Sequence, residues 1–194
     1  MLQHPPETLI EVTGLGKTYP GAHQPALNGL DLSVPRGSIF GLLGPNGAGK
    51  TTTISILCTL LLPSCGAANI MGHDVVRNAA QIRRLIGLVP QDIALYPTLS
   101  ARENLQFFAR MLRIPGNQID KRVSACLEMV GLSDAADKKI GSFSGGMKRR
   151  ANFAAGILHE PELLFLDEPT VGIDAQSRHL ILDLLLKLNR SGMT

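Results

Sequence analysis

The sequence contains only three cysteines and no tryptophan. Cys58, Cys65 and Cys126 are odd in number and show no C-x-x-C spacing, which argues against a disulfide framework or a zinc site. We interpret them as reduced thiols that pack inside the protein. The five histidines show no metal-binding spacing either. Domains that depend on disulfides or structural zinc are therefore excluded.

Long apolar runs are also missing. No segment approaches the ~18–20 apolar residues that a membrane-spanning helix requires. The most apolar candidate, ISILCTLLLP (54–63), is short and contains Ser and Thr. The first ten residues lack the apolar centre of a signal peptide. We expect a cytoplasmic protein that reaches a membrane, if at all, through another chain.

Charge is modest, since charged residues make up 18% of the chain and the net charge is +3. The basic excess is not gathered into a long run, so we expect no nucleic-acid partner. The chain has 194 residues, of which 44% are hydrophobic. That is enough for one well-filled core, or for one domain with an attached lobe.

Short apolar runs bounded by Gly and Pro predict several strands. These runs lie at 9–12, 30–34, 38–44, 68–71, 85–89 and 163–166. The last of them, LLFL, is apolar throughout, as is typical of a strand buried on both faces of a parallel sheet. Helical patterns follow these runs, and the alternation predicts an α/β fold.

Helix signals are clearest in the second half of the chain. Ser100 with Glu103 forms a capping box, and Asn117 and Asp174 are expected to cap two later helices. Another helical pattern covers 147–158. An earlier helical pattern begins at Thr51 and is expected to continue to Leu62, where Pro63 ends it.

The stretch GPNGAGKT (44–51) matches G-x-x-x-x-G-K-[ST] between a predicted strand and a predicted helix. Glycines allow the backbone N–H groups to point inward at phosphate oxygens, and the helix adds its positive N-terminal end. Lys50 is expected to reach the β- and γ-phosphates, Thr51 to offer its hydroxyl to Mg²⁺, and Thr52 to reach a phosphate.

A magnesium nucleotide site also needs acids, and the stretch LLFLDEP supplies them at a strand end. Asp167 can hold Mg²⁺ through water, and Glu168 can accept a proton from the attacking water. Gln91 follows another strand and could sense Mg²⁺ or water, although a single Gln is commonly a surface residue. Tyr19 could stack on a base or simply pack.

GSFSGGMKRR (141–150) sets two adjacent glycines before three cationic side chains. Those cations, Lys148, Arg149 and Arg150, are most simply solvated. The order of phosphate loop, Gln91, FSGGM, LLFLDE and GID resembles the ATP-binding subunits of ABC transporters over essentially the whole chain. SFSGGM (142–147) is similar to the family's signature sequence, and VGID (171–174) is similar to its D-loop.

The resemblance implies a fold, a set of domains and a set of site residues. The fold is an α/β P-loop NTPase domain of the ABC type, with a mostly parallel central sheet, an N-terminal antiparallel β part and a helical lobe. Residues 1–194 form one such domain, with 92–160 as the lobe. Glu168 is the catalytic base, and Thr51, Gln91 and Asp167 hold Mg²⁺. The implied ATP-binding residues are Tyr19, Gly44, Asn46, Gly47, Ala48, Gly49, Lys50, Thr51, Thr52 and Gln91.

The resemblance also implies a dimer. Two subunits meet head to tail, so that Ser144, Gly145, Gly146 and Asp174 act across the dimer on ATP bound to the other copy. The partners are a second copy or a related ATPase, and a membrane permease on a separate chain. The protein is expected at the inner face of the cell membrane, where ATP hydrolysis powers export of drugs, lipids or other small molecules.

Phe143, Met147 and Ile173 depart from the commoner Leu, Gln and Leu of the family, but none of these departures removes a phosphate donor. Met147 with the basic residues after it is similar to exporters of the daunorubicin-resistance type. The alternatives are a soluble ABC ATPase that acts on DNA or ribosomes, or a nucleotide kinase, which has no use for FSGGM. In the family a further strand and a histidine follow the segment RSGMT, so we expect a C-terminally truncated domain.

Overall fold

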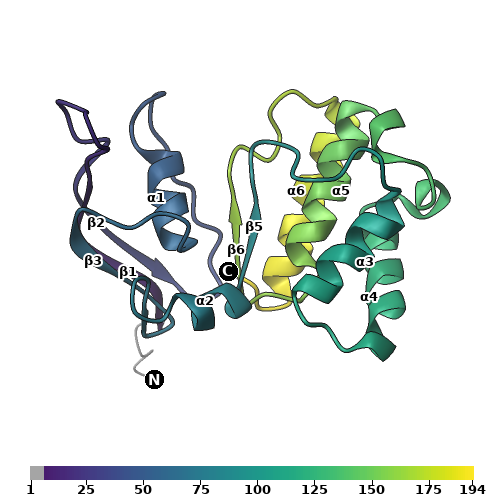
Figure 1. The fold of residues 1–194 in the computed structure, drawn as a ribbon, viewed down its shortest axis with the longest axis horizontal. Coiled ribbons are helices and arrows are strands. Elements are labelled where there is room, and N and C mark those ends of the chain that lie inside the picture. Colours follow the sequence, from purple (N-terminus) through teal and green to yellow (C-terminus); the bar gives the residue numbers. More distant parts are fainter. Residues whose placement is uncertain (1–6) are drawn as a thin grey trace, which may run out of the picture. The chain divides into compact units, whose positions relative to one another are not determined.

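The computed structural model describes residues 7–194, which form two compact units (Figure 1). One unit runs to Ile86 and includes Gly192–Thr194, and the other is Gly87–Ser191. In the described part of the chain, no helix is both long and apolar enough to cross a bilayer.

An antiparallel sheet dominates the first unit. Its strands are β1 (Thr8–Lys17), β2 (Leu27–Pro35), β3 (Cys65–Ile70) and β4 (His73–Asp74), in the order β2-β1-β3-β4. Ile10 faces Val34 on one side and Ile70 on the other, and all three side chains are buried. The predicted strands at 9–12, 30–34 and 68–71 are thus found, and cross-strand pairing places Ile10, Val34 and Ile70 on one buried face of the sheet.

The predicted strand at 38–44 is wrong. Residues 38–45 have no regular secondary structure. Ile39, Phe40 and Leu43 are 60%, 47% and 92% exposed, although their composition predicted a buried strand. The physical reason is that no described strand pairs with this segment. An apolar run without a ladder partner cannot satisfy its backbone groups as a strand does.

Two short helices complete the first unit. α1 (Lys50–Leu57) follows the glycine-rich loop, and α2 (Ala79–Leu85) precedes the next strand. The sequence predicted that the first helix would continue to residue 62, but it ends at Leu57. The helix cannot continue because Thr59 adopts a left-handed conformation with φ 59°.

The second unit is built on a pair of strands, β5 (Ile86–Val89) and β6 (Leu163–Leu166), as predicted. Both strands run in the same direction in Figure 1. The helices α3 (Ala101–Met111), α4 (Gly116–Met129), α5 (Gly145–Ile157) and α6 (Ala175–Arg190) pack against one another on one side of this strand pair (Figure 1). Two single 3₁₀ turns, Ser133–Ala135 and Ile140–Ser142, lie between α4 and α5.

The helix ends in this unit agree with the predicted caps in two cases out of three. Ser100 accepts from the amide of Glu103 while Glu103 accepts from that of Ser100, a complete capping box. Asp174 caps α6. The cap predicted at Asn117 is wrong, because α4 already begins at Gly116, directly after Pro115, whose φ of −54° suits a helix start.

α5 packs very closely on β5 at a pair of glycines. A Cβ on Gly87 would collide with the carbonyl oxygen of Gly156, and one on Gly156 would lie 2.7 Å from a methyl carbon of Val89. Phe153, on the same helix, is completely buried. No side chain therefore fits between α5 and β5 at these two positions, and their backbones pack directly against each other.

Candidate nucleotide site

The glycine-rich loop before α1 has the backbone that the sequence predicts. Gly47 and Gly49 have φ values of 83° and 85°, which L-residues with side chains rarely adopt. A Cβ on Gly49 would also lie 2.6 Å from the carbonyl oxygen of Ala26. α1 has no side-chain cap and no acidic residue in its first turn. Its N-terminal amides are therefore available to an anion.

Lys50 lies where its ammonium group bridges the loop. The Nζ atom donates to the carbonyl oxygens of Gly44 at 2.8 Å and of Pro45 at 2.9 Å. The loop's own carbonyls thus hold the cation at the loop, and an incoming phosphate would replace them with stronger, charged acceptors.

Tyr19 lies beside the start of α1. Its hydroxyl is 3.3 Å from Thr52 Oγ1, and the Lys17 ammonium lies 5.6 Å from the ring centroid. The side chain is 42% exposed. Because the ring is not buried, the alternative that Tyr19 serves only to pack the core is disfavoured.

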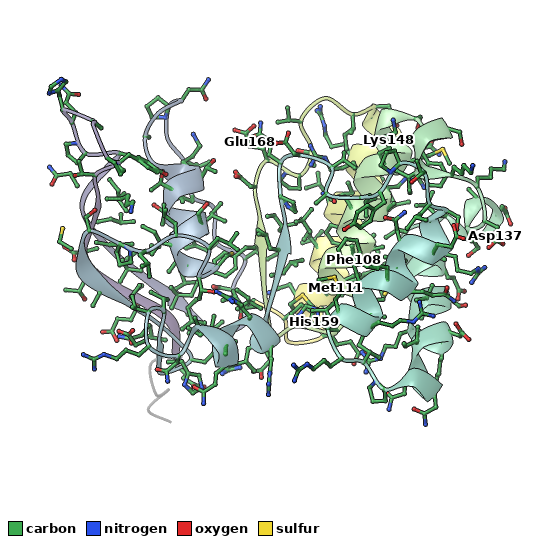
Figure 2. All side chains as sticks on the ribbon, in the orientation of Figure 1. Phe108, Met111, Asp137, Lys148, His159 and Glu168 are labelled. Carbon is green, nitrogen blue, oxygen red and sulfur yellow. The ribbon has the colours of Figure 1, made fainter. Side chains whose placement is uncertain are left out.

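Asp167 and Glu168 follow directly after the end of β6, and Figure 2 labels Glu168 there. Asp167 is 8% exposed, and its amide donates to the carbonyl of Val89 at 3.0 Å, which extends the β5–β6 pairing. Glu168 has φ 48°, a left-handed conformation that is uncommon for a residue with a side chain. Such local strain often accompanies functional positions.

Gln91 and Glu168 are brought together although 77 residues separate them. The Nε2 atom of Gln91 donates to Glu168 Oε2 at 3.1 Å. The sequence left open whether Gln91 was an ordinary surface residue. Gln91 is exposed, and its contact with Glu168 places it among the groups that follow the strand ends.

The Ser-Gly-Gly unit uses its two glycines for different purposes. Ser144 caps α5, because its Oγ accepts from the amide of Met147 at 3.2 Å. Gly146 is buried, and a Cβ there would collide with Asp174 and Ser177 at the start of α6. Gly145 is exposed. Gly146 is therefore needed for packing, while Ser144 and Gly145 present an open, anion-favouring helix start.

Asp174 is held in place by its own helix. Its Oδ1 accepts from the amide of Ser177 at 2.8 Å. This hydrogen bond lowers the pKa of the Asp174 carboxyl, so the group stays ionised at neutral pH. The same turn that caps α6 thus fixes the Asp174 carboxylate beside Gly146 at the start of α5.

Arg149 is buried, contrary to the prediction that it is solvated, and Arg150 is half-buried. Arg149 is only 6% exposed and donates to the carbonyls of Pro90 and Gln91. Arg150 donates to the carbonyls of Val130 and Gly131 at the end of α4. The signal that sequence reasoning missed is helical spacing, since Arg149 lies three residues after buried Gly146 and four before buried Phe153.

The candidate residues are thus divided between the two units. Tyr19 and the loop 44–52 belong to the first, while Gln91, Asp167 and Glu168 belong to the second with the signature. Over residues 7–194, His, Cys, Asp and Glu side chains do not gather in threes as a metal-binding cluster.

Comparison with known proteins decides the family. Residues 27–171 match the family model described as ABC transporter. The chain belongs to the ABC transporter family.

Similar proteins include the linearmycin resistance ATP-binding protein LnrL of Bacillus subtilis, which is 46% identical over 96% of this chain and 59% of its own length. The daunorubicin/doxorubicin resistance ATP-binding protein DrrA of Streptomyces peucetius is 42% identical over 97% of this chain and 57% of its own length. The chain therefore spans somewhat more than half the length of these curated relatives.

Solved structures are also similar. The ATP-binding cassette MJ0796, described as a dimer in a post-hydrolysis state bound to ADP and Pi, superposes with a TM-score of 0.87 at 30% identity. The match covers 96% of this chain and 85% of that one. The mixed α/β fold with an antiparallel sheet, a parallel strand pair and a helical region is that of ABC ATP-binding domains.

Proposed function

We propose that the protein binds MgATP at the phosphate loop and hydrolyses it to power export by a separate membrane permease. The observation that carries the proposal is the loop itself, in which Gly47 and Gly49 turn the backbone and Lys50 places its cation beside an uncapped helix start. Such a site fits a polyphosphate. The relatives' names, which refer to resistance and ATP binding, support the link to export.

The chain's own residues have distinct tasks in this reaction. Glu168 accepts a proton from the attacking water, and Gln91 holds the Glu168 carboxylate through its amide. Tyr19 offers an exposed ring on which adenine can stack.

Thr51, Gln91 and Asp167 carry hydroxyl, amide carbonyl and carboxylate oxygens, the ligand types that the hard cation Mg²⁺ prefers. We assign Thr51, Gln91 and Asp167 to hold it. When bound, Mg²⁺ supplies positive charge that offsets the negative charge of the phosphates.

We further propose that two copies, or this chain and a related ATPase, form an ATP-dependent dimer. Ser144, Gly145, Gly146 and Asp174 of one copy would face the nucleotide held by the other. The exposure of Ser144 and Gly145 at the start of α5 supports this arrangement. The Ser144 Oγ atom accepts a hydrogen bond from the amide of Met147, and its hydroxyl hydrogen can still donate to a phosphate oxygen.

The proposal places residues 1–194 in one ABC ATPase domain with 92–160 as the helical lobe. It also places the protein at the inner face of the cell membrane, bound to its permease. Isolation of the intact protein from its own cells tests this directly. The expected result is MgATP turnover and a co-isolated polytopic membrane protein. Co-isolation with ribosomes or DNA instead would favour the soluble alternative.

The dimer is tested with Ser144→Arg. The long cation should leave nucleotide binding to a single copy intact but block dimer formation in sedimentation with MgATP. Mixing this variant with Lys50→Ala separates the two roles, because each composite dimer then keeps one intact nucleotide site. Loss of nucleotide binding by single copies of Ser144→Arg would contradict the arrangement.

A further inference from the structure

Arg149 ties the signature helix to the segment that carries Gln91. Its Nη1 atom donates to the carbonyl oxygen of Pro90 at 3.0 Å and to that of Gln91 at 2.7 Å. Arg149 is only 6% exposed. Burying a charged group is costly, and these hydrogen bonds to backbone carbonyls offset part of that cost only while the segment at Pro90 and Gln91 stays in place.

Asn152, about one turn further along α5, forms hydrogen bonds with the same segment, residues 90–94. Its Nδ2 atom donates to the carbonyls of Pro90 at 3.2 Å and of Asp92 at 3.4 Å, and its Oδ1 accepts from the amide of Ala94 at 3.1 Å. Asn152 is 2% exposed. The main chain of 90–94 therefore follows α5, although it lies in an irregular loop.

The helix that makes these contacts is firmly held. Its close packing on β5 at Gly87 and Gly156 leaves it no room to slide. Its N-terminus rests against Asp174 and Ser177 through Gly146. α5 thus links Ser144 at its start to Asn152 eight residues later, a distance of about 12 Å along the helix axis.

From these contacts we infer that Arg149 and Asn152 are positioning residues for the hydrolysis reaction. They hold the backbone at Gln91 so that its amide donates to Glu168 and keeps that carboxylate oriented. We call Arg149 and Asn152, with the carbonyls and amide that they bind at 90–94, the clamp. Since α5 also begins at Ser144 and Gly145, the clamp links the orientation of Gln91 to the Ser-Gly-Gly unit. This inference rests on the proposed function for the role of Glu168, while the clamp itself rests on the contacts alone.

The test uses Arg149→Met in the intact protein, because Met fills a similar volume without any donor. We expect kcat to fall on the order of 10- to 100-fold, as for a misplacement of about 1 Å near reacting groups. KM for MgATP should change less than kcat, because the phosphate loop is unchanged and Gln91 supplies only one of the three residues assigned to Mg²⁺. Hydrogen exchange at the amides of 91–94 should become faster. Arg149→Lys, which restores one donor, should recover part of both properties.

Arg150→Met is the matched control. It removes the same kind of contact from the same helix, but at Val130 and Gly131. Its melting temperature should fall while amide exchange at 91–94 stays at the wild-type rate. If Arg149→Met does not fold, Asn152→Ala carries the same expectations for kcat, KM and exchange.

Two results would overturn the inference. One is wild-type kcat in Arg149→Met, and the other is loss of kcat without faster exchange at 91–94, which would separate Arg149 from Gln91. Absence of MgATP turnover in the wild-type protein is a different failure, that of the proposed function. In that case the exchange rates still decide whether the clamp exists.

Discussion

Two apolar runs of this chain have similar composition, but only one of them forms a strand. SIFGLL (38–43) leads into the phosphate loop, and LLFL (163–166) leads into the acid pair. The second forms β6, in which Leu163 is 3% exposed. The first forms no strand, and its Leu43 is 92% exposed.

The two runs differ in whether a neighbouring strand is present to pair with them, and not in their intrinsic β-strand propensity. β6 has β5 beside it, and the pairing extends to the hydrogen bond from the Asp167 amide to the Val89 carbonyl. Residues 38–43 pair with no described strand. Apolar composition indicates that a segment would be favourably buried, but a strand also needs a neighbour for its N–H and C=O groups.

The largest expected effect concerns the acids that follow the formed strand. Glu168→Gln removes the proton acceptor but keeps the shape and the amide contacts, so turnover should fall by about 10²–10⁴. ATP affinity should be retained, and the ATP-bound dimer should accumulate. Steady-state turnover, nucleotide titration and sedimentation of the intact protein measure the three quantities. Unchanged turnover would reassign Glu168 to a structural role.

Phe165→Ala probes the formed strand itself. Phe165 is 8% exposed within β6, and deletion of a buried Phe side chain typically costs about 3–5 kcal/mol. Denaturant unfolding should show this loss in the free energy of unfolding. A change below ~1 kcal/mol would mean that β6 contributes little to the stability of its unit.

The strand pair also marks what the sequence could predict. Apolar runs located β1, β2, β3, β5 and β6, and Ser100 with Glu103 and Asp174 located two helix starts. These features depend on residues near one another in sequence. The failures at 38–44 and at residues 58–62 depend on a missing partner and on the left-handed Thr59, which composition does not report.

The site was predictable to a similar extent. Local sequence motifs predict the phosphate loop and the strand-end acids, because nucleotide binding requires those residue types next to one another in sequence. The contact of Gln91 with Glu168 and the burial of Arg149 arise from the fold, which brings together residues 77 and 58 positions apart. Only the spacing of Arg149 from Gly146 and Phe153 gave a signal in advance.

Lys50→Ala tests the motif that follows the run without a strand. The variant loses the charged donor that the loop holds beside Gly44 and Pro45. Hydrogen bonds to charged groups contribute about 1.5–3 kcal/mol, so MgATP affinity should fall roughly 10- to 100-fold. Nucleotide titration of the intact protein and of the variant provides the comparison. Equal affinities would show that the loop is not the nucleotide site.

The smallest expected effect, and the sharpest comparison, comes from Phe40→Ala. Phe40 lies in 38–43 and is 47% exposed, so its truncation in the 194-residue chain should change the free energy of unfolding by less than about 1 kcal/mol. Phe165→Ala is the matched control, since the same atoms are removed from a paired strand. If a strand pairs with 38–43 in a longer protein, Phe40→Ala becomes as costly there as Phe165→Ala, because burial then depends on the ladder. A loss of about 3 kcal/mol or more in the 194-residue chain itself would contradict the exposure of this segment.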